Sequence, residues 1–144
     1  MSARAAALVA ASLLFASSCS EKSLQGEIAC QRRMIALTDE ALLRPPAPGR
    51  RVSSLPFETA SRGFEQMPVD GCSDDQLARA RTMARTTGHL SDIATRVGAM
   101  PGPAQMAHLR GNQAFMEFLA ELENLRNRRR VLAEDLDRMV AESR

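Results

Sequence analysis

Apolar side chains recur every three or four residues in three stretches of this chain, which is the spacing of one face of an α-helix. The first stretch covers residues 23–43. Its apolar face is formed by Leu24, Ile28, Ile35 and Leu42. Arg44 and a run containing Pro45, Pro46 and Pro48 follow directly. Because proline cannot continue a helix, the first predicted helix ends at Leu43.

The second predicted helix begins at Ser73 and ends near Gly98. The Ser73 side chain can cap free amide groups while Gln76 reaches back to it, and the two acidic residues that follow Ser73 favour the positive end of the helix dipole. The apolar stripe drifts slowly around this helix. It is formed by Leu77, Ala80, Ala84, Thr87, Leu90, Ile93, Val97 and Met100.

The third predicted helix runs from about Pro103 to Glu142, after a tight Pro-Gly-Pro break, and its apolar positions alternate three and four apart as a heptad seam. The seam is formed by Phe115, Phe118, Leu122, Leu125, Leu132, Leu136 and Met139. Arg129 occupies one expected seam position. So wide an apolar face fits packing within one chain or pairing with a second copy. An antiparallel hairpin with the helix at 73–98 is favoured, because the connection is short.

Between the first two helices lies a predicted linker at residues 44–72. It contains five of the seven prolines and several glycines, so regular structure is not expected there. Phe57 and Phe64 could pin this linker to the helices.

The fold class predicted from these patterns is all-α, with three helices, the last two forming a long antiparallel hairpin with a coiled-coil-like seam. Residues 19–144 are expected to form a single domain, with a short tether at 19–22 and the hairpin at 73–144. Aromatic residues make up only 3% of the chain, and Trp and Tyr are absent. The core is therefore expected to consist mainly of Leu, Met and Ala.

Residues 1–18 have the composition of an export signal: a charged start at Arg4, an apolar run of about 12 residues, and then small residues. A membrane span would need around 20 apolar residues. The segment from Ala16 through Ser17 and Ser18 to Cys19 resembles a bacterial lipoprotein signal. The resemblance implies cleavage before Cys19, acylation of that cysteine, and a membrane anchor. With Ser20 next, it implies sorting to the outer membrane, with the domain facing the periplasm.

Ordinary signal cleavage before Cys19 is the alternative, because Ala16 and Ser18 also satisfy the small-x-small rule. Lipidation of Cys19 would leave Cys30 and Cys72 as the only possible intrachain pair, which suits an oxidising compartment. Their bond would close a loop of roughly 43 residues, worth about 4 kcal/mol. Two reduced, buried thiols are the alternative.

Residues that could carry chemistry are few. Four arginines at 126 and 128–130 form a charge run, but acidic residues surround them at helix-pairing distances, so a solvated, salt-bridged face is expected. With a net charge of +2 and interleaved signs, nucleic acid is not an expected partner. Methionine and histidine side chains near the interhelical break could offer ligands to copper(I), namely Met100, Met106, His108 and His89. Methionines on helix faces are more often core, so no metal site is predicted.

No catalytic set of nucleophile, base and orienting group stands out, so neither an enzyme nor a cofactor is expected. The function predicted from the sequence is an envelope-anchored helical lipoprotein that acts as a binding or scaffold module. It would contact a protein partner, or a second copy, through the seam and the overhanging end of the third helix. The alternative is a soluble periplasmic helical chaperone or metal-binding protein.

Overall fold

The computed structural model describes residues 23–43, 49–98 and 113–144, and this part of the chain folds into four α-helices. The N-terminal helix covers residues 23–42. It is followed by α2 (Leu55–Glu65), α3 (Asp74–Val97) and α4 (Gln113–Glu142). The all-α prediction is confirmed, and the prediction of three helices is wrong.

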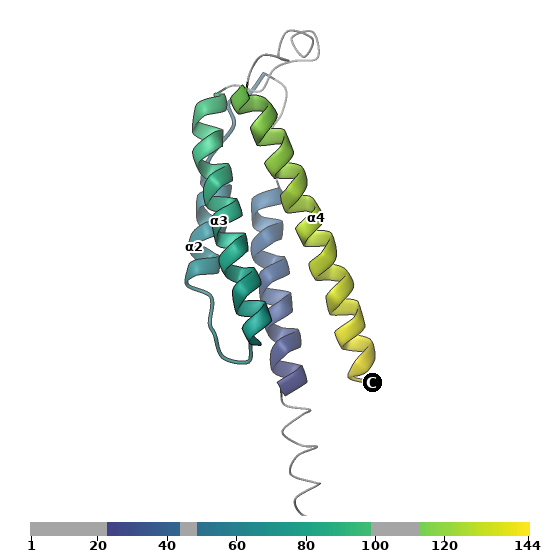
Figure 1. Cartoon of the computed structure of the whole chain (residues 1–144). Coiled ribbons are helices and arrows are strands. Elements are labelled where there is room, and N and C mark those ends of the chain that lie inside the picture. The colour runs from purple at the N-terminus through teal and green to yellow at the C-terminus, as the bar shows by residue number, and fades with distance from the viewer. Residues whose placement is uncertain (1–22, 44–48, 99–112) are drawn as a thin grey trace, which may run out of the picture.

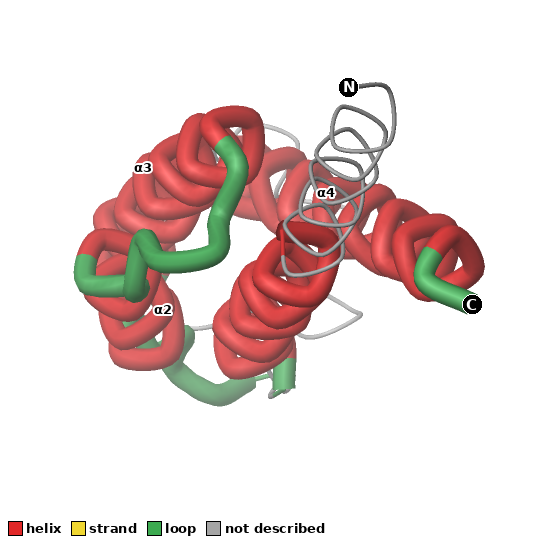
Figure 2. Tube along the Cα trace, turned by 90° about the horizontal axis from the view of Figure 1, so that it is seen from below, coloured by secondary structure: helices red, strands yellow, loops and turns green. Residues whose placement is uncertain are grey.

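The four helices run alternately up and down, so that consecutive helices are antiparallel (Figure 1). Seen along the bundle in Figure 2, α2 and α3 lie side by side, the N-terminal helix packs beside them, and α4 closes the opposite side. Towards its carboxyl end α4 leans away from the other helices. The arrangement is an up-down-up-down bundle with one short member.

The additional helix, α2, lies inside the segment that the proline content predicted to be irregular. Pro56 occupies the first turn of α2, where a helix needs no backbone N–H from that residue, and Pro68 follows the end of the helix. The eleven residues of α2 thus meet no proline beyond the first turn. Phe57, Ala60 and Phe64 are its buried face, at spacings of three and four. That spacing was the signal for a helix, and the proline count obscured it.

The core is one continuous cluster to which all four helices contribute. Phe118 of α4 is fully buried and meets Phe57 of α2 edge to face, with the ring centroids 5.9 Å apart. The same core cluster contains Leu90 and Ile93 of α3 and apolar side chains of the N-terminal helix. Phe57 therefore does pin its segment to the bundle, as expected, but as part of a helix.

Both ends of α3 form as the sequence predicts. The Ser73 hydroxyl accepts a hydrogen bond from the Gln76 backbone N–H, and the Gln76 side-chain oxygen accepts one from the Ser73 backbone N–H. At the other end Gly98 adopts a φ of 68°, a conformation that favours glycine and stops the helix. The Gly98 carbonyl accepts a hydrogen bond from the Val52 N–H, which ties the segment before α2 to the end of α3.

The predicted start of the third long helix at Pro103 lies outside the described residues, as do the candidate ligands Met100, Met106 and His108. Within the described part, α4 begins at Gln113 and extends for 30 residues to Glu142. The end of the helix therefore agrees with the prediction.

Candidate functional site

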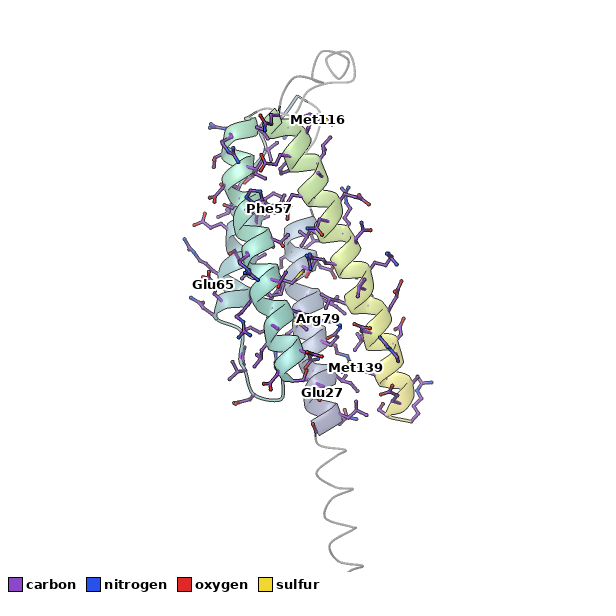
Figure 3. The ribbon with its side chains drawn as sticks, in the orientation of Figure 1. Glu27, Phe57, Glu65, Arg79, Met116 and Met139 are labelled. Atoms are coloured by element: carbon purple, nitrogen blue, oxygen red, sulfur yellow. A yellow bond between two sulfur atoms is a disulfide. The ribbon has the colours of Figure 1, made fainter. Side chains whose placement is uncertain are left out.

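The heptad seam of α4 is mostly used inside the molecule. Five of its seven positions are buried, namely Phe115, Phe118, Leu122, Leu125 and Leu132. The last two, Leu136 and Met139, are half-buried at the end of α4 that leans away (Figure 3). A partner could not reach the buried five positions without opening the bundle. Only the final turns of the predicted interaction seam are accessible.

Arg129, which interrupts the seam, is accounted for by a partner on another helix. Its Nε donates a hydrogen bond to Asp39 Oδ1 at 2.8 Å, which joins α4 to the N-terminal helix. The hydrogen bond and the charge of Asp39 together raise the pKa of Arg129 above its ordinary value. Arg129 therefore stays cationic at every working pH, and the half-exposed pair is worth less than about 1 kcal/mol. Two other arginines of the run pair within α4, Arg126 with Glu123 and Arg130 with Glu134.

A buried amide network connects three helices at the lower end of the bundle. The Gln31 side chain, 2% exposed, donates a hydrogen bond to the Leu132 carbonyl of α4 at 2.9 Å and accepts one from Gln76 of α3. Gln76 also donates to the Glu27 carbonyl at 2.8 Å. Because buried amides are costly without partners, this network sets the axial register of the helices.

Within the described residues, a groove lies between α2, the segment that follows it, and α3. It has a volume of about 810 Å³. Its walls are formed by α2, by the segment that follows α2, and by one face of α3, with apolar contributions from Phe64, Met67, Val69, Leu77, Ala80 and Ala84. Val69 is 61% exposed although it is a large aliphatic side chain. This groove is the candidate functional site.

Small residues form the floor of the groove along α3. Ala80, Ala84 and Gly88 follow one another at intervals of four residues, so they lie in a row on one helix face. Ala80 and Ala84 are buried, and their size lets α2 pack closely over the row: the Ser61 hydroxyl donates a hydrogen bond to the Ala84 carbonyl at 2.9 Å, and a Cβ on Gly88 would meet that hydroxyl at 3.3 Å. The sequence signal for this face was the apolar stripe itself, since Ala80 and Ala84 belong to it and are buried in the core.

The rim of the groove carries two arginines and two carboxylates that form no ion pair with another described residue. Arg81 and Arg85 are exposed on successive turns of α3, and neither forms an ion pair with another described residue. Glu65 on α2 and Asp92 near the end of α3 are acidic members of the rim. Figure 3 shows Glu65 at the outer edge of α2.

His89, a candidate copper ligand in the sequence, instead faces a carboxylate of α4. Its Nε2 lies 3.0 Å from Glu117 Oε1, and Arg96 of α3 approaches the same carboxylate at 3.8 Å. Among the described residues, no three His, Cys, Asp or Glu side chains gather closely enough to hold a metal ion.

Cys30 and Cys72 form a disulfide, with their Cα atoms 5.3 Å apart. The bond attaches the segment between α2 and α3 to the N-terminal helix. Immediately beside it the backbones of Gly26 and Gly71 touch, since a Cβ on Gly26 would lie 2.9 Å from the Gly71 Cα. Glycine at both positions allows this approach. The bond and the contact together hold the wall of the groove that contains Met67 and Val69.

The proposed lipidation site, Cys19, lies outside the described residues. None of the helices in the described ranges is long and apolar enough to cross a membrane. Comparisons with protein-family models, curated proteins and solved structures found no match.

Proposed function

We propose that this protein is an envelope lipoprotein, tethered through Cys19, whose bundle binds an acidic amphipathic helix of a partner protein in the groove between α2 and α3. The observation that carries the proposal is the groove itself, because Val69 in its wall is 61% exposed and Leu77 on α3 is only half-buried. The helix-helix contact expected from the sequence is thus assigned to α3, since most of the α4 seam is occupied within the chain.

A helix fits the dimensions of this site. The lining residues of α3 extend from Leu77 to Asp92, which corresponds to about 22 Å of helix length. Apolar side chains of a partner helix, three and four residues apart, could pack against Val69 and Leu77, which are the apolar lining side chains with exposed surface. Burial of this apolar surface would supply most of the binding free energy.

The two arginines of the rim favour a partner helix that places carboxylates opposite them, away from Glu65 and Asp92. Arg81 and Arg85 lie one helical turn apart on the rim and lack carboxylate partners among the described side chains. Carboxylates of a bound helix would pair with them, which favours encounter and orientation more than affinity. The coiled-coil-like character of the α3–α4 pairing is not needed for this function and stays a prediction.

The groove is tested by two matched substitutions of exposed aliphatic residues. Val69, in the groove wall, and Leu55, at the start of α2 outside the groove, are 61% and 65% exposed. We expect Val69→Asp to reduce cross-linking of the partner from a photoreactive residue at rim position 65 by tenfold or more, corresponding to about 1.4 kcal/mol. A charge buried against an apolar helix face and repelled by acidic flanks gives this loss. Leu55→Asp is expected to leave cross-linking unchanged.

The adduct is identified by mass spectrometry of the cross-linked peptide, which is expected to be an acidic segment with helical periodicity in a different protein. Equal cross-linking by the two variants would remove the groove from the proposal. An adduct with twice the mass of this chain would show that a second copy occupies the groove instead.

The anchor is tested by metabolic labelling with radioactive palmitate. We expect the intact protein to be labelled and to sediment with membranes, and Cys19→Ser to lose both properties, because the thiol is the acylation site. With the described helix beginning at Ser23, a tether of four residues would hold the bundle within about 14 Å of the lipid surface. An unlabelled wild-type protein in the soluble fraction would favour ordinary signal cleavage and the soluble alternative.

A further inference from the structure

The two sulfur atoms of the disulfide differ in accessibility. Cys30, on the N-terminal helix, lies in the hydrophobic core and is 0% exposed. Cys72, which precedes α3, is half-buried, so it has a surface that solvent reaches. An attacking thiolate must approach a sulfur in line with the S–S bond, so access decides which sulfur reacts. Of the two cysteines, only Cys72 has exposed surface in the folded protein, so an external thiolate can approach the bond from its side alone.

Cys72 also has a cation beside it. Arg33 Nη2 lies 3.7 Å from the Cys72 sulfur and donates a hydrogen bond to the Asp70 carbonyl at 3.2 Å, which fixes the guanidinium in place. The Arg33 Nε is buried without a hydrogen-bond partner. Cys72 directly precedes the N-cap of α3, so the positive end of a 24-residue helix adds to the same field. Both features stabilise negative charge on this sulfur.

Nearby groups that destabilise negative charge on the Cys72 sulfur have weaker effects, or solvent screens them better. The Pro68 carbonyl oxygen lies 3.5 Å from the Cys72 sulfur, but it carries only a partial charge. The carboxylates of Asp70, Asp74 and Asp75 are on exposed residues, where water and salt reduce their influence. Arg33 is half-buried and acts at shorter range.

We propose that Cys72 is the sulfur through which a dithiol oxidoreductase exchanges with this protein, and that Cys30 is the resolving sulfur. In the reducing direction, a thiolate of the oxidoreductase attacks Cys72 Sγ and forms a mixed disulfide, while the bond to Cys30 breaks and Cys30 leaves as a thiolate that takes up a proton. The second thiol of the oxidoreductase loses its proton and displaces Cys72 as a thiolate. The oxidoreductase is thereby oxidised by two electrons, and this protein is reduced by two.

The bond forms by the reverse route. The Cys72 thiolate attacks the disulfide of the oxidised oxidoreductase, whose other sulfur leaves as a thiolate. Cys30 then loses its proton and attacks Cys72 Sγ, which releases the oxidoreductase. Burial of Cys30 keeps it from external disulfides, while the folded bundle holds it next to Cys72. The arrangement directs oxidation through one mixed disulfide.

The test uses the full chain carrying Cys19→Ser, with the native disulfide intact, and a thioredoxin-like reductase that retains only its attacking cysteine. We expect the mixed disulfide to form at Cys72, with Cys30 recovered as the free, alkylatable thiol by mass spectrometry. Recovery of the mixed disulfide at Cys30 would overturn the proposal.

The role of Arg33 is measured with a neighbouring arginine as the control. Arg33→Met is expected to slow formation of the mixed disulfide between the reduced protein and an oxidised oxidoreductase by about tenfold, because the cation no longer stabilises the Cys72 thiolate that attacks. Arg33→Lys retains the charge and is expected to retain the rate within about threefold. Arg32→Met alters an exposed side chain on the next position and is expected to change the rate less than about twofold. Equal rates for Arg33→Met and Arg32→Met, with unfolding midpoints unchanged, would contradict the assignment.

Discussion

Removal of the Cys30–Cys72 bond is expected to lower the free energy of unfolding by about 4 kcal/mol. The bond closes a loop with a sequence separation of 42, which contains all of α2. Without it the unfolded chain gains the conformational entropy of that loop, while the folded contacts stay in place. For a domain of this size such a change lowers the melting temperature by roughly 15 °C or more.

The measurement compares urea unfolding of the Cys19→Ser protein with and without a reducing agent, followed by circular dichroism. Cys72→Ala is the genetic counterpart, and it is preferable to a substitution at Cys30 because the fully buried position would add a cavity cost. Transitions that coincide with and without reductant would show that the loop remains constrained in the unfolded state, or that the thiols are unpaired in solution.

Replacement of Phe118 by alanine is expected to cost a similar amount, about 4 kcal/mol. Its ring is fully buried at the point where α4 meets α2, and it forms an edge-to-face contact with Phe57. The substitution removes buried apolar surface and leaves a cavity that fixed helices cannot close. Because Phe118 packs against Phe57 of the short helix α2, we also expect α2 to lose protection against hydrogen exchange.

Met116 is the matched control, since it lies two residues away on α4 but is 51% exposed. Met116→Ala is expected to change the free energy of unfolding by less than about 0.5 kcal/mol. A cost below about 2 kcal/mol for Phe118→Ala would mean that α4 packs less tightly than its seam implies.

Features that depend on neighbouring residues could be predicted from the chain. The capping box of α3 requires only Ser73 and Gln76 at a separation of three residues, and the structure confirms it. The C-terminal end of α3 at Gly98 is confirmed for the same reason, because glycine adopts the required positive φ locally. The seam positions from Phe115 to Leu132 were recognisable by periodicity, since burial follows the helical repeat. The pairing of Cys30 and Cys72 followed from cysteine number and the predicted export.

The predicted linker shows how far such local signals reach. Three of its prolines precede the helix, Pro56 lies within the first turn of α2, and Pro68 follows it. Composition alone could not distinguish prolines that flank a helix from prolines that prevent one. What makes α2 a helix in the folded protein is the burial of Phe57 and Phe64 against partners far away in sequence. An isolated segment of eleven residues would be marginal in water.

The elements that give this protein a site came from contacts between distant segments. The groove needs α2, the following segment and α3 together, so neither its walls nor its row of small residues could be placed before α2 was known. Periodicity places Arg129 on the seam, but an arginine is accommodated there because it pairs with Asp39 on another helix. The accessible sulfur at Cys72 and its neighbour Arg33 likewise meet only after folding. Helical periodicity and helix-end signals depend on residues within one or two turns of each other, so they can be recognised in the sequence. Burial, charge partners and exposed surface depend on which faces of the packed helices stay uncovered, so only the tertiary structure decides them.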